Sequence, residues 1–544
     1  MKCFENAARA RSFTRIEKLL GLGIMGGLLS VSALAQSRAN VSVDLAKPVN
    51  MLIDTSLSVP AFSYDASQYN QAVIPYLRAA GITAVRFPAN HGVADLYHWS
   101  TKTTTRYKAA ETPYVAPDSN FGSFAQYAEK LGRAVIVVNY GSNQDGDGGG
   151  EPAEAAAWVA YANGDPNSTV ALGKDSTGED WKTVGYWATL RSQAPLAADD
   201  GLNFLRIQHP RPFNFKLWQI GDQIYKNGFF GGEMTGNPDL HDAIPTAAKD
   251  WGKLKGNAKM APAAVAANLV AFSKAMKAVD PTILLGLSVP VPGDESSRAP
   301  EWASNVLKGA CSSLDYANLE WTTSNVLPPD WKILDEPKTL GGTTDTLATI
   351  LNGMIGIYNK SCPKDHMLRL AFAPAGIATW PKIEHPMVNP LWIADTYAML
   401  IESGSININA PEMIGDTMIS ADRKKLGPSF YGLQMLHIIA RAPGDLLLNA
   451  SSNFPSTLSA HATHRRDGMV GIMLINKDPQ SSYTVKVTLK NGTVGTTGKR
   501  FDYGAEQLSA GAAMTTTPFS FTGNEFTVTV APYSIADILL PDHN

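Results

Sequence analysis

This chain has few cysteines and few charges. Its 544 residues include three cysteines, and Asp, Glu, Lys and Arg together make up 17% of it. The net charge of −3 leaves no basic excess for binding nucleic acid or an anionic membrane surface. Phosphate-binding loops, zinc spacings, coiled-coil heptads and internal repeats are also absent from the sequence. We therefore expect no cofactor, no metal and no nucleic-acid partner.

Long apolar runs are missing as well, apart from one near the N-terminus. A basic segment that includes Lys2 and Arg15 precedes the apolar stretch Leu19 to Val31, and Ala33-Leu34-Ala35 follows it. This is the pattern of a cleaved signal peptide over residues 1–35. An uncleaved inner-membrane anchor is the alternative, although the stretch is shorter than the ~20 residues that a span needs. The prediction is a secreted or periplasmic protein with no membrane contact after signal cleavage.

Strand and helix patterns alternate regularly between residues 51 and 443. Apolar helical stretches such as Phe121 to Leu131 and Pro262 to Val279 lie between strand-like ones. Alternation of this kind predicts a parallel sheet of the α/β class, and eight such units suit a (β/α)8 TIM barrel. The strand-like stretches are Ile82 to Phe87, Ala134 to Asn139, Phe213 to Ile220, Thr282 to Val289, Leu314 to Trp321, Met367 to Phe372 and Ser405 to Asn409.

The pattern changes in residues 444–544. Only short alternating strands follow, and turns such as Asp467-Gly468 and Asn491-Gly492 separate them. This pattern predicts a C-terminal antiparallel β-sandwich.

Several segments resemble the arabinofuranosidase-like members of the clan A glycoside hydrolases. Leu217 to Gly231 reads LWQIGDQIYKNGFFG, where the family shows W-E-I-G-N-E-x-Y-G-N-G. Pro88 to Trp99 resembles the family's P-G-G-S-x-A-D-x-Y-H-W, and Gly471 to Pro479, GIMLINKDP, resembles its closing sandwich. The resemblance extends over the chain after the signal peptide. It implies a barrel over 51–443 and a sandwich over 444–544 that the N-terminal strand, 36–50, joins.

The resemblance places two catalytic carboxyls where this chain has none. Gln223 takes the position of the general acid/base, and aligning the family's T-E-x-N with Ala373 to Gly376 puts Pro374 at the nucleophile. A retaining glycosidase needs two carboxyls about 5 Å apart, and an amide cannot donate and regain a proton near neutral pH. Glu320 near the end of the sixth strand is the candidate replacement acid, and a structural role as partner of a Trp or of Arg86 is the alternative.

Other candidates follow the strand ends, where the active site of such a barrel lies. Because Asp222 adjoins Gln223, its side chain is expected to face the other way. Each candidate has fold stabilisation as its alternative role. The substrate-binding candidates are Arg86, Asn90, His91, Asn139, Tyr140, Asp222 and Tyr225.

Two groups of residues suggest metal sites only weakly. Asp145 and Asp147 lie in a Gly-rich loop that lacks the closing Glu of a calcium loop, so a solvated turn is the favoured interpretation. His461 and His464 are too isolated for a metal site, and we expect them on the sandwich surface.

A disulfide is expected between the two cysteines that remain after Cys3 leaves with the signal peptide. A lone pair in an exported protein is a disulfide candidate. Cys311 and Cys362 lie just before the sixth and seventh barrel strands. Neighbouring parallel strands are about 5 Å apart, so the two sulfurs can meet.

Three functions follow from these observations. The first, which we favour, is an exported glycoside-hydrolase-like protein that binds a polysaccharide or oligosaccharide in a barrel groove without the usual retaining hydrolysis. The second is an active arabinofuranosidase-like glycosidase that uses relocated acids such as Glu320. The third is a structural extracellular-matrix scaffold that self-associates.

Overall fold

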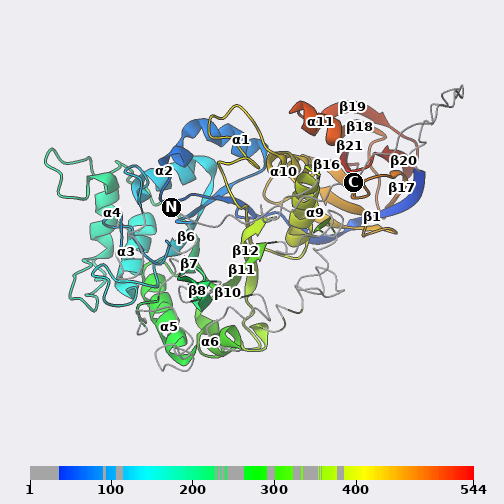
Figure 1. The fold of residues 1–544 in the computed structure, drawn as a ribbon. Coiled ribbons are helices and arrows are strands. Elements are labelled where there is room, and N and C mark those ends of the chain that lie inside the picture. The colour runs from blue at the N-terminus through cyan, green and yellow to red at the C-terminus, as the bar shows by residue number, and fades with distance from the viewer. Residues whose placement is uncertain are drawn as a thin grey trace, which may run out of the picture.

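Two bodies make up the fold, a closed barrel and a nine-stranded sheet (Figure 1). The structure is a computed structural model. The residues that it describes are 36–89, 93–105, 114–226, 229–230, 233–234, 239–241, 262–290, 301–322, 333–334, 353, 356, 358–376 and 385–543.

Eight parallel strands close into a barrel, which confirms the predicted TIM architecture. The sequence analysis named seven of them and missed the first, β2, whose four residues are all buried and end in Pro60. A strand this short shows no alternation. Around the barrel the strands are β2 (Leu57–Pro60), β3 (Ala84–Phe87), β6 (Arg133–Val138), β7 (Leu217–Ile220), β10 (Leu284–Val289), β11 (Tyr316–Thr322), β12 (Arg369–Gly376) and β13 (Asn407–Asn409).

Helices cover the outside of the barrel, and local signals set their ends. The side chain of Asn120 accepts from the Ser123 N–H at 3.0 Å and begins α2, which ends at Gly132 with φ of 158°. The helix α4, capped by Thr183, was not predicted. The barrel helices are α1 (Ile74–Ala79), α2 (Phe121–Leu131), α3 (Pro152–Asn163), α4 (Val184–Ser192), α5 (Pro262–Val279), α6 (Trp302–Ala310), α9 (Val388–Glu402) and α10 (Pro428–Ile439).

The two faces of the barrel strands differ in chemistry. Alternate residues such as Trp218 and Leu285 join the large apolar core between strands and helices. The opposite face carries polar side chains that bond to a neighbouring strand or to nearby backbone, since Ser58 of β2 donates to Asn409 of β13 at 2.9 Å and Gln219 donates to the Gly221 carbonyl at 2.7 Å. The barrel interior is therefore partly polar, and it leads up to the strand ends where the site is expected.

A nine-stranded sheet forms the second body. β1 pairs with β14 antiparallel and with β17 parallel, so the predicted sandwich is antiparallel except at this pair. Inward residues of β1, β17 and β20 share one apolar core with those of β16 and β21. The strands are β1 (Gln36–Met51), β14 (Leu446–Ser452), β15 (Leu458–His464), β16 (Met469–Asn476), β17 (Ser482–Lys490), β18 (Thr497–Tyr503), β19 (Thr515–Ser520), β20 (Glu525–Val530) and β21 (Ser534–Pro541), with the short helix α11 (Ala505–Ala510).

Barrel and sheet meet through α9 and α10, which lie between them in Figure 1. The interface is partly aromatic, since Tyr431 of α10 stacks on Tyr503 of β18 with ring centroids 4.8 Å apart. The Arg465 guanidinium donates to the Ile438 carbonyl at 2.7 Å. Apolar packing and hydrogen bonds thus join the two bodies directly.

A buried set of charges lies in the same interface, and we call Asp395, Glu402, His461 and Lys477 the interface cluster. The Asp395 carboxylate accepts from Lys477 Nζ at 2.8 Å and from His461 Nε2 at 2.9 Å. Glu402 faces the other ring nitrogen of His461 at 2.8 Å. The predicted surface position of His461 is therefore wrong, because α9 docks over β15 and covers the ring, whereas His464 is only partly buried and contacts Asp542.

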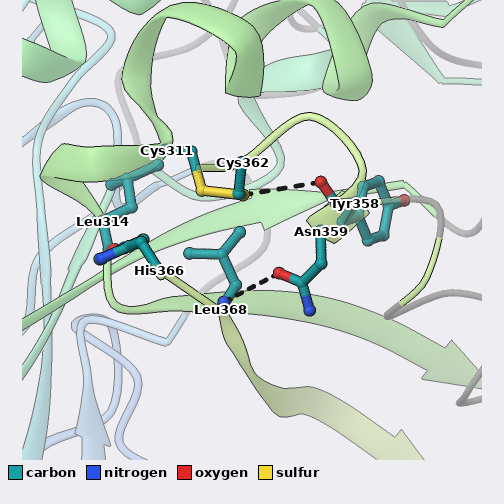
Figure 2. The surroundings of a disulfide bond; sticks show 7 residues. All are labelled: Cys311, Leu314, Tyr358, Asn359, Cys362, His366 and Leu368. Carbon is teal, nitrogen blue, oxygen red and sulfur yellow. Dashed lines mark hydrogen bonds between the residues drawn. A yellow bond between two sulfur atoms is a disulfide. The ribbon is translucent and has the colours of Figure 1, made fainter. Parts of the chain in front are cut away.

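The predicted disulfide between Cys311 and Cys362 is confirmed, with the Cα atoms 5.4 Å apart (Figure 2). The cysteines precede the adjacent strands β11 and β12, as expected. The neighbouring His366 ring contacts the Leu314 carbonyl at 2.6 Å and helps hold the two strand entrances together. The bridge joins residues 51 positions apart. On the chain-entropy model a loop of this length is worth roughly 4 kcal/mol.

Candidate functional site at the carboxyl ends of the barrel strands

A tight turn after β7 positions the residues at the centre of the candidate site. Gly221 has φ of 67°, and a Cβ atom there would lie 2.4 Å from the Ile224 side chain, so the turn requires glycine. Gln223 follows with φ of 53°, in the left-handed region. The turn directs Asp222 and Gln223 to different partners.

Gln223 meets Glu320 across the barrel mouth. The Gln223 amide Nε2 donates to a carboxylate oxygen of Glu320 at 2.5 Å. Gln223 is 4% exposed, and Glu320, at the end of β11, is partly exposed. β10 lies between β7 and β11 and pairs with both, so the two side chains meet across one intervening strand.

The nucleophile position lies beside Glu320. Leu319 pairs with Phe372 and Trp321 pairs with Ala375, so both Ala373 and Pro374 lie opposite Glu320. This extra residue is a bulge in β12. The backbone of Pro374 is described and its side chain is not, and the described residues place no carboxyl at this point of β12.

Arg86, Asp95 and Asp222 form a buried charge cluster that holds the turn after β7 in place. We call these three residues the mouth cluster. Arg86 Nη2 donates to Asp222 Oδ1 at 3.0 Å, and both side chains are almost fully buried. Arg86 thus pairs with Asp222, whereas Glu320 accepts a hydrogen bond from Gln223. Asp222 and Gln223 do face different ways, as adjacent positions suggest.

Asp95 joins three loops, and the sequence analysis did not single it out. Its two carboxylate oxygens accept from the backbone N–H groups of Tyr140, at 3.1 Å, and of Asp222, at 2.9 Å. Burial, together with the nearby charge of Asp222, raises the pKa of Asp95 to about 8. Asp95 lies within Pro88 to Trp99, and the resemblance of that segment to the family could have identified it from the sequence.

The remaining substrate-binding candidates are held in the walls of the site. Asn139 donates to Ser142 Oγ at 3.2 Å. The Tyr140 hydroxyl accepts from Asn268 at 3.3 Å, and the ring of Tyr225 lies 6.4 Å from that of Trp302. All three candidates are at most 5% exposed. Asn90 and His91 lie outside the described residues.

Two further acids have local structural roles where the structure describes them. Glu412, after β13, accepts from the Thr417 N–H at 2.8 Å within its own loop. Glu154 holds the ring of His98, whose two nitrogens contact Glu154 at 3.0 Å and Thr105 at 2.5 Å. Neither arrangement supplies a second carboxyl next to Glu320.

Metal-binding geometry is absent from the described residues, which hold no group of three or more His, Cys, Asp or Glu side chains able to bind an ion. In the Gly-rich loop, Asn143 Oδ1 accepts from the N–H groups of Gly146, Asp147 and Gly148. Asn143 Nδ2 also donates to Asp147. These contacts are those of the predicted turn. None of the described helices has the length and apolarity that crossing a bilayer requires.

No protein-family model and no curated protein matches this chain. Solved structures do match. The α-L-arabinofuranosidase from Thermotoga maritima, solved as an arabinose complex, superposes with a TM-score of 0.64 at 14% identity over 93% of this chain and 100% of its own. The chain has the fold of a glycoside hydrolase. The resemblance inferred from the sequence is thereby confirmed as a shared fold.

Two other solved glycoside hydrolases share this fold. The GH51 arabinofuranosidase from Thermotoga petrophila RKU-1 gives a TM-score of 0.63 at 16% identity, covering 92% of this chain and 99% of that one. The Paenibacillus polymyxa xyloglucanase from family 44 gives 0.58 at 14% identity, covering 93% and 100%. At such identities the likeness extends to the fold and not to the substrate.

Proposed function

We propose that this protein is an exported glycoside-hydrolase-like protein that binds a polysaccharide or oligosaccharide at the barrel mouth without retaining hydrolysis. The observation that carries the proposal is the 2.5 Å hydrogen bond from the Gln223 amide to Glu320. Retaining hydrolysis needs one carboxyl to protonate the leaving oxygen and a second, about 5 Å away, to attack. Among the described residues, the Gln223 amide takes the place of the first carboxyl and faces the carboxylate of Glu320.

The glutamine at position 223 supports binding without turnover. A glutamine is nearly isosteric with a glutamate, so pocket shape and a hydrogen bond to a sugar oxygen survive while the transferable proton is lost. Arg86 Nε and the Ser288 hydroxyl in the barrel are buried and have no hydrogen-bond partner among the described residues. Buried polar atoms are normally satisfied, so these two favour a polar ligand or water in the interior.

The fold neighbours support a carbohydrate as the ligand class. These neighbours are enzymes named for their action on arabinofuranosides and xyloglucan. Export is proposed from the N-terminal sequence pattern alone.

A second candidate function has one observation in its favour. Glu320 is partly exposed at the barrel mouth and lies opposite the nucleophile position. A relocated acid would take such a place. For hydrolysis it would still need a second carboxyl, and the neighbouring carboxylate Asp222 is paired with Arg86.

The deciding experiment compares binding and turnover in the mature protein. A panel of aryl glycosides, with an arabinofuranoside among them, measures hydrolysis, and a glycan array measures binding. We expect glycan binding without hydrolysis, weakened by Glu320→Gln and unchanged by the control Glu506→Gln on the exposed helix α11. Robust aryl glycoside hydrolysis that Glu320→Gln abolishes would establish the second function instead. Absence of both binding and hydrolysis would leave the scaffold prediction, which sedimentation of the purified protein would test.

A further inference from the structure

A cavity of about 590 Å³ lies at the opposite end of the barrel from Gln223 and Glu320. On the barrel side its lining includes Ile82, just before β3, and Leu131, at the end of α2. On the other side it is lined by the segment after α10 and by the turn between β15 and β16. The cavity thus lies where the amino ends of the strands face the sandwich.

Three arginines from separate segments line this cavity. Arg78 comes from α1, Arg441 follows α10, and Arg466 lies in the β15–β16 turn. Arg78 uses part of its guanidinium on the Lys130 carbonyl and Arg466 uses part of its own on the Pro443 carbonyl. For Arg441 the described residues provide no side-chain hydrogen bond or ion pair.

The two acids in the lining are already engaged. Asp445 is buried and accepts from three backbone N–H groups, those of Arg441, Ala442 and Arg466, at 2.7 to 2.9 Å. Asp467 is paired with the Arg465 guanidinium outside the lining. Positive charge is therefore in excess on the cavity wall.

A histidine completes the wall. His437 Nδ1 is buried and has no hydrogen-bond partner among the described residues. Burial, and then the charge of Arg441, lowers the pKa of His437 to about 4, so the ring is neutral near pH 7. Gly81 makes room for it, since a Cβ atom there would lie 2.9 Å from Nδ1.

We infer that this cavity binds a small oxyanion-bearing ligand, with a phosphate or carboxylate group held by Arg441, Arg466 and Arg78. Guanidinium groups offer paired N–H donors that match both kinds of oxyanion. Ile82 and Leu131 also lie in the lining, where both are nearly fully buried. Because the arginines come from both bodies of the fold, the bound anion would also bridge the barrel and the sandwich. This site is separate from the proposed glycan groove.

The test is isothermal titration of the mature protein with inorganic phosphate, sulfate and glucuronate at constant ionic strength. We expect saturable binding of one equivalent for at least one of them, and comparing the three distinguishes a phosphate-type ligand from a carboxylate. The double variant Arg441→Gln with Arg466→Gln should weaken that binding at least about tenfold. Both side chains are exposed, so these variants should fold, and Arg441→Gln alone provides an intermediate case.

The matched control removes the same charge far from the cavity. Arg38 is exposed at the other end of β1 from Met51, roughly 40 Å along the strand. The Arg38→Gln variant should bind the anion as the unaltered protein does. Equal affinity in the double variant and the control, or no saturable binding of any of the three anions, would overturn the inference. Neutral glycan binding at the barrel mouth should not respond to these variants, so the two proposals fail or stand separately.

Discussion

The mouth cluster and the interface cluster are both buried, yet their charges balance differently. The mouth cluster sets two carboxyls, Asp95 and Asp222, against the single cation Arg86. The interface cluster sets two carboxylates against Lys477 and a His461 ring held between both acids. Burial alone would lower the pKa of His461, but Glu402 and Asp395 raise it to about 10, whereas burial raises that of Asp95 to about 8.

The difference shows how charge balance separates a structural site from a site of chemistry. In the interface cluster each ion has a partner, and the pKa of Asp395 is held well below its ordinary range by Lys477 and His461 despite burial. In the mouth cluster Arg86 pairs with Asp222, and the other carboxyl, Asp95, keeps a proton near neutral pH. The interface cluster, whose charges balance, joins the barrel and the sheet. The mouth cluster, whose charges do not, keeps a titratable group beside the candidate site.

The largest expected effect comes from unbalancing the interface cluster. The Lys477→Met variant leaves Asp395 with one cation in a site where both side chains are about 2% exposed. We expect a loss of about 3–5 kcal/mol in unfolding free energy, measured by urea denaturation. Lys486→Met, which breaks the exposed pair with Glu525, is the control and should show no measurable loss. Equal effects of the two changes would mean that the interface cluster is not what joins the bodies.

Breaking the mouth cluster should lower the unfolding free energy by less than breaking the interface cluster. In Arg86→Met the Asp222 carboxylate loses its cation but keeps the hydrogen bond from the Gln219 amide at 3.3 Å. A loss of about 1.5–3 kcal/mol is expected from the charged hydrogen bond, by the same denaturation assay. The exposed Arg133–Asp54 pair supplies the control, Arg133→Met. A loss greater than that of Lys477→Met would reverse the ranking of the two clusters.

The two clusters should also respond in different pH windows. The folded pKa of Asp95 is raised, so its contribution is complete below pH 3.8 and is lost as pH rises toward about 8. The contribution of His461 is complete below pH 6.5 and is lost as pH rises toward about 10. Stability measured from pH 4 to 10 should lose its lower slope in Asp95→Asn and its upper slope in His461→Gln. Unchanged slopes in both variants would contradict these assignments.

Restoring an acid at the mouth should change activity least. Gln223→Glu alone is expected to give little aryl arabinofuranoside turnover, because Pro374 supplies no nucleophile. The double change Gln223→Glu with Pro374→Glu has the better chance, limited by the bulge at Ala373 and Pro374 that must orient the new acid. Turnover is measured by release of the aryl group. Strong hydrolysis by Gln223→Glu alone would show that a nucleophile is already present.

The alternation of strand and helix patterns predicted the barrel and the places where its strands begin, and the short alternating strands after residue 443 predicted the sandwich. That was enough to place Cys311 beside Cys362, since both precede neighbouring strands. Local pattern failed for β2, which is too short to alternate, and for β18, which was not predicted. Periodicity reports which face of an element is apolar, and it needs several residues to do so.

Contacts between distant parts of the chain were decided by the tertiary structure alone. Gln223 and Glu320 are 97 residues apart, and their hydrogen bond exists because β7 and β11 both pair with β10 in the barrel. His461 reads as an isolated surface residue until α9 supplies Asp395 and Glu402 around it. The sequence shows which residues could ionise or donate. Burial and partners determine whether they do, and both arise only when separate elements pack together.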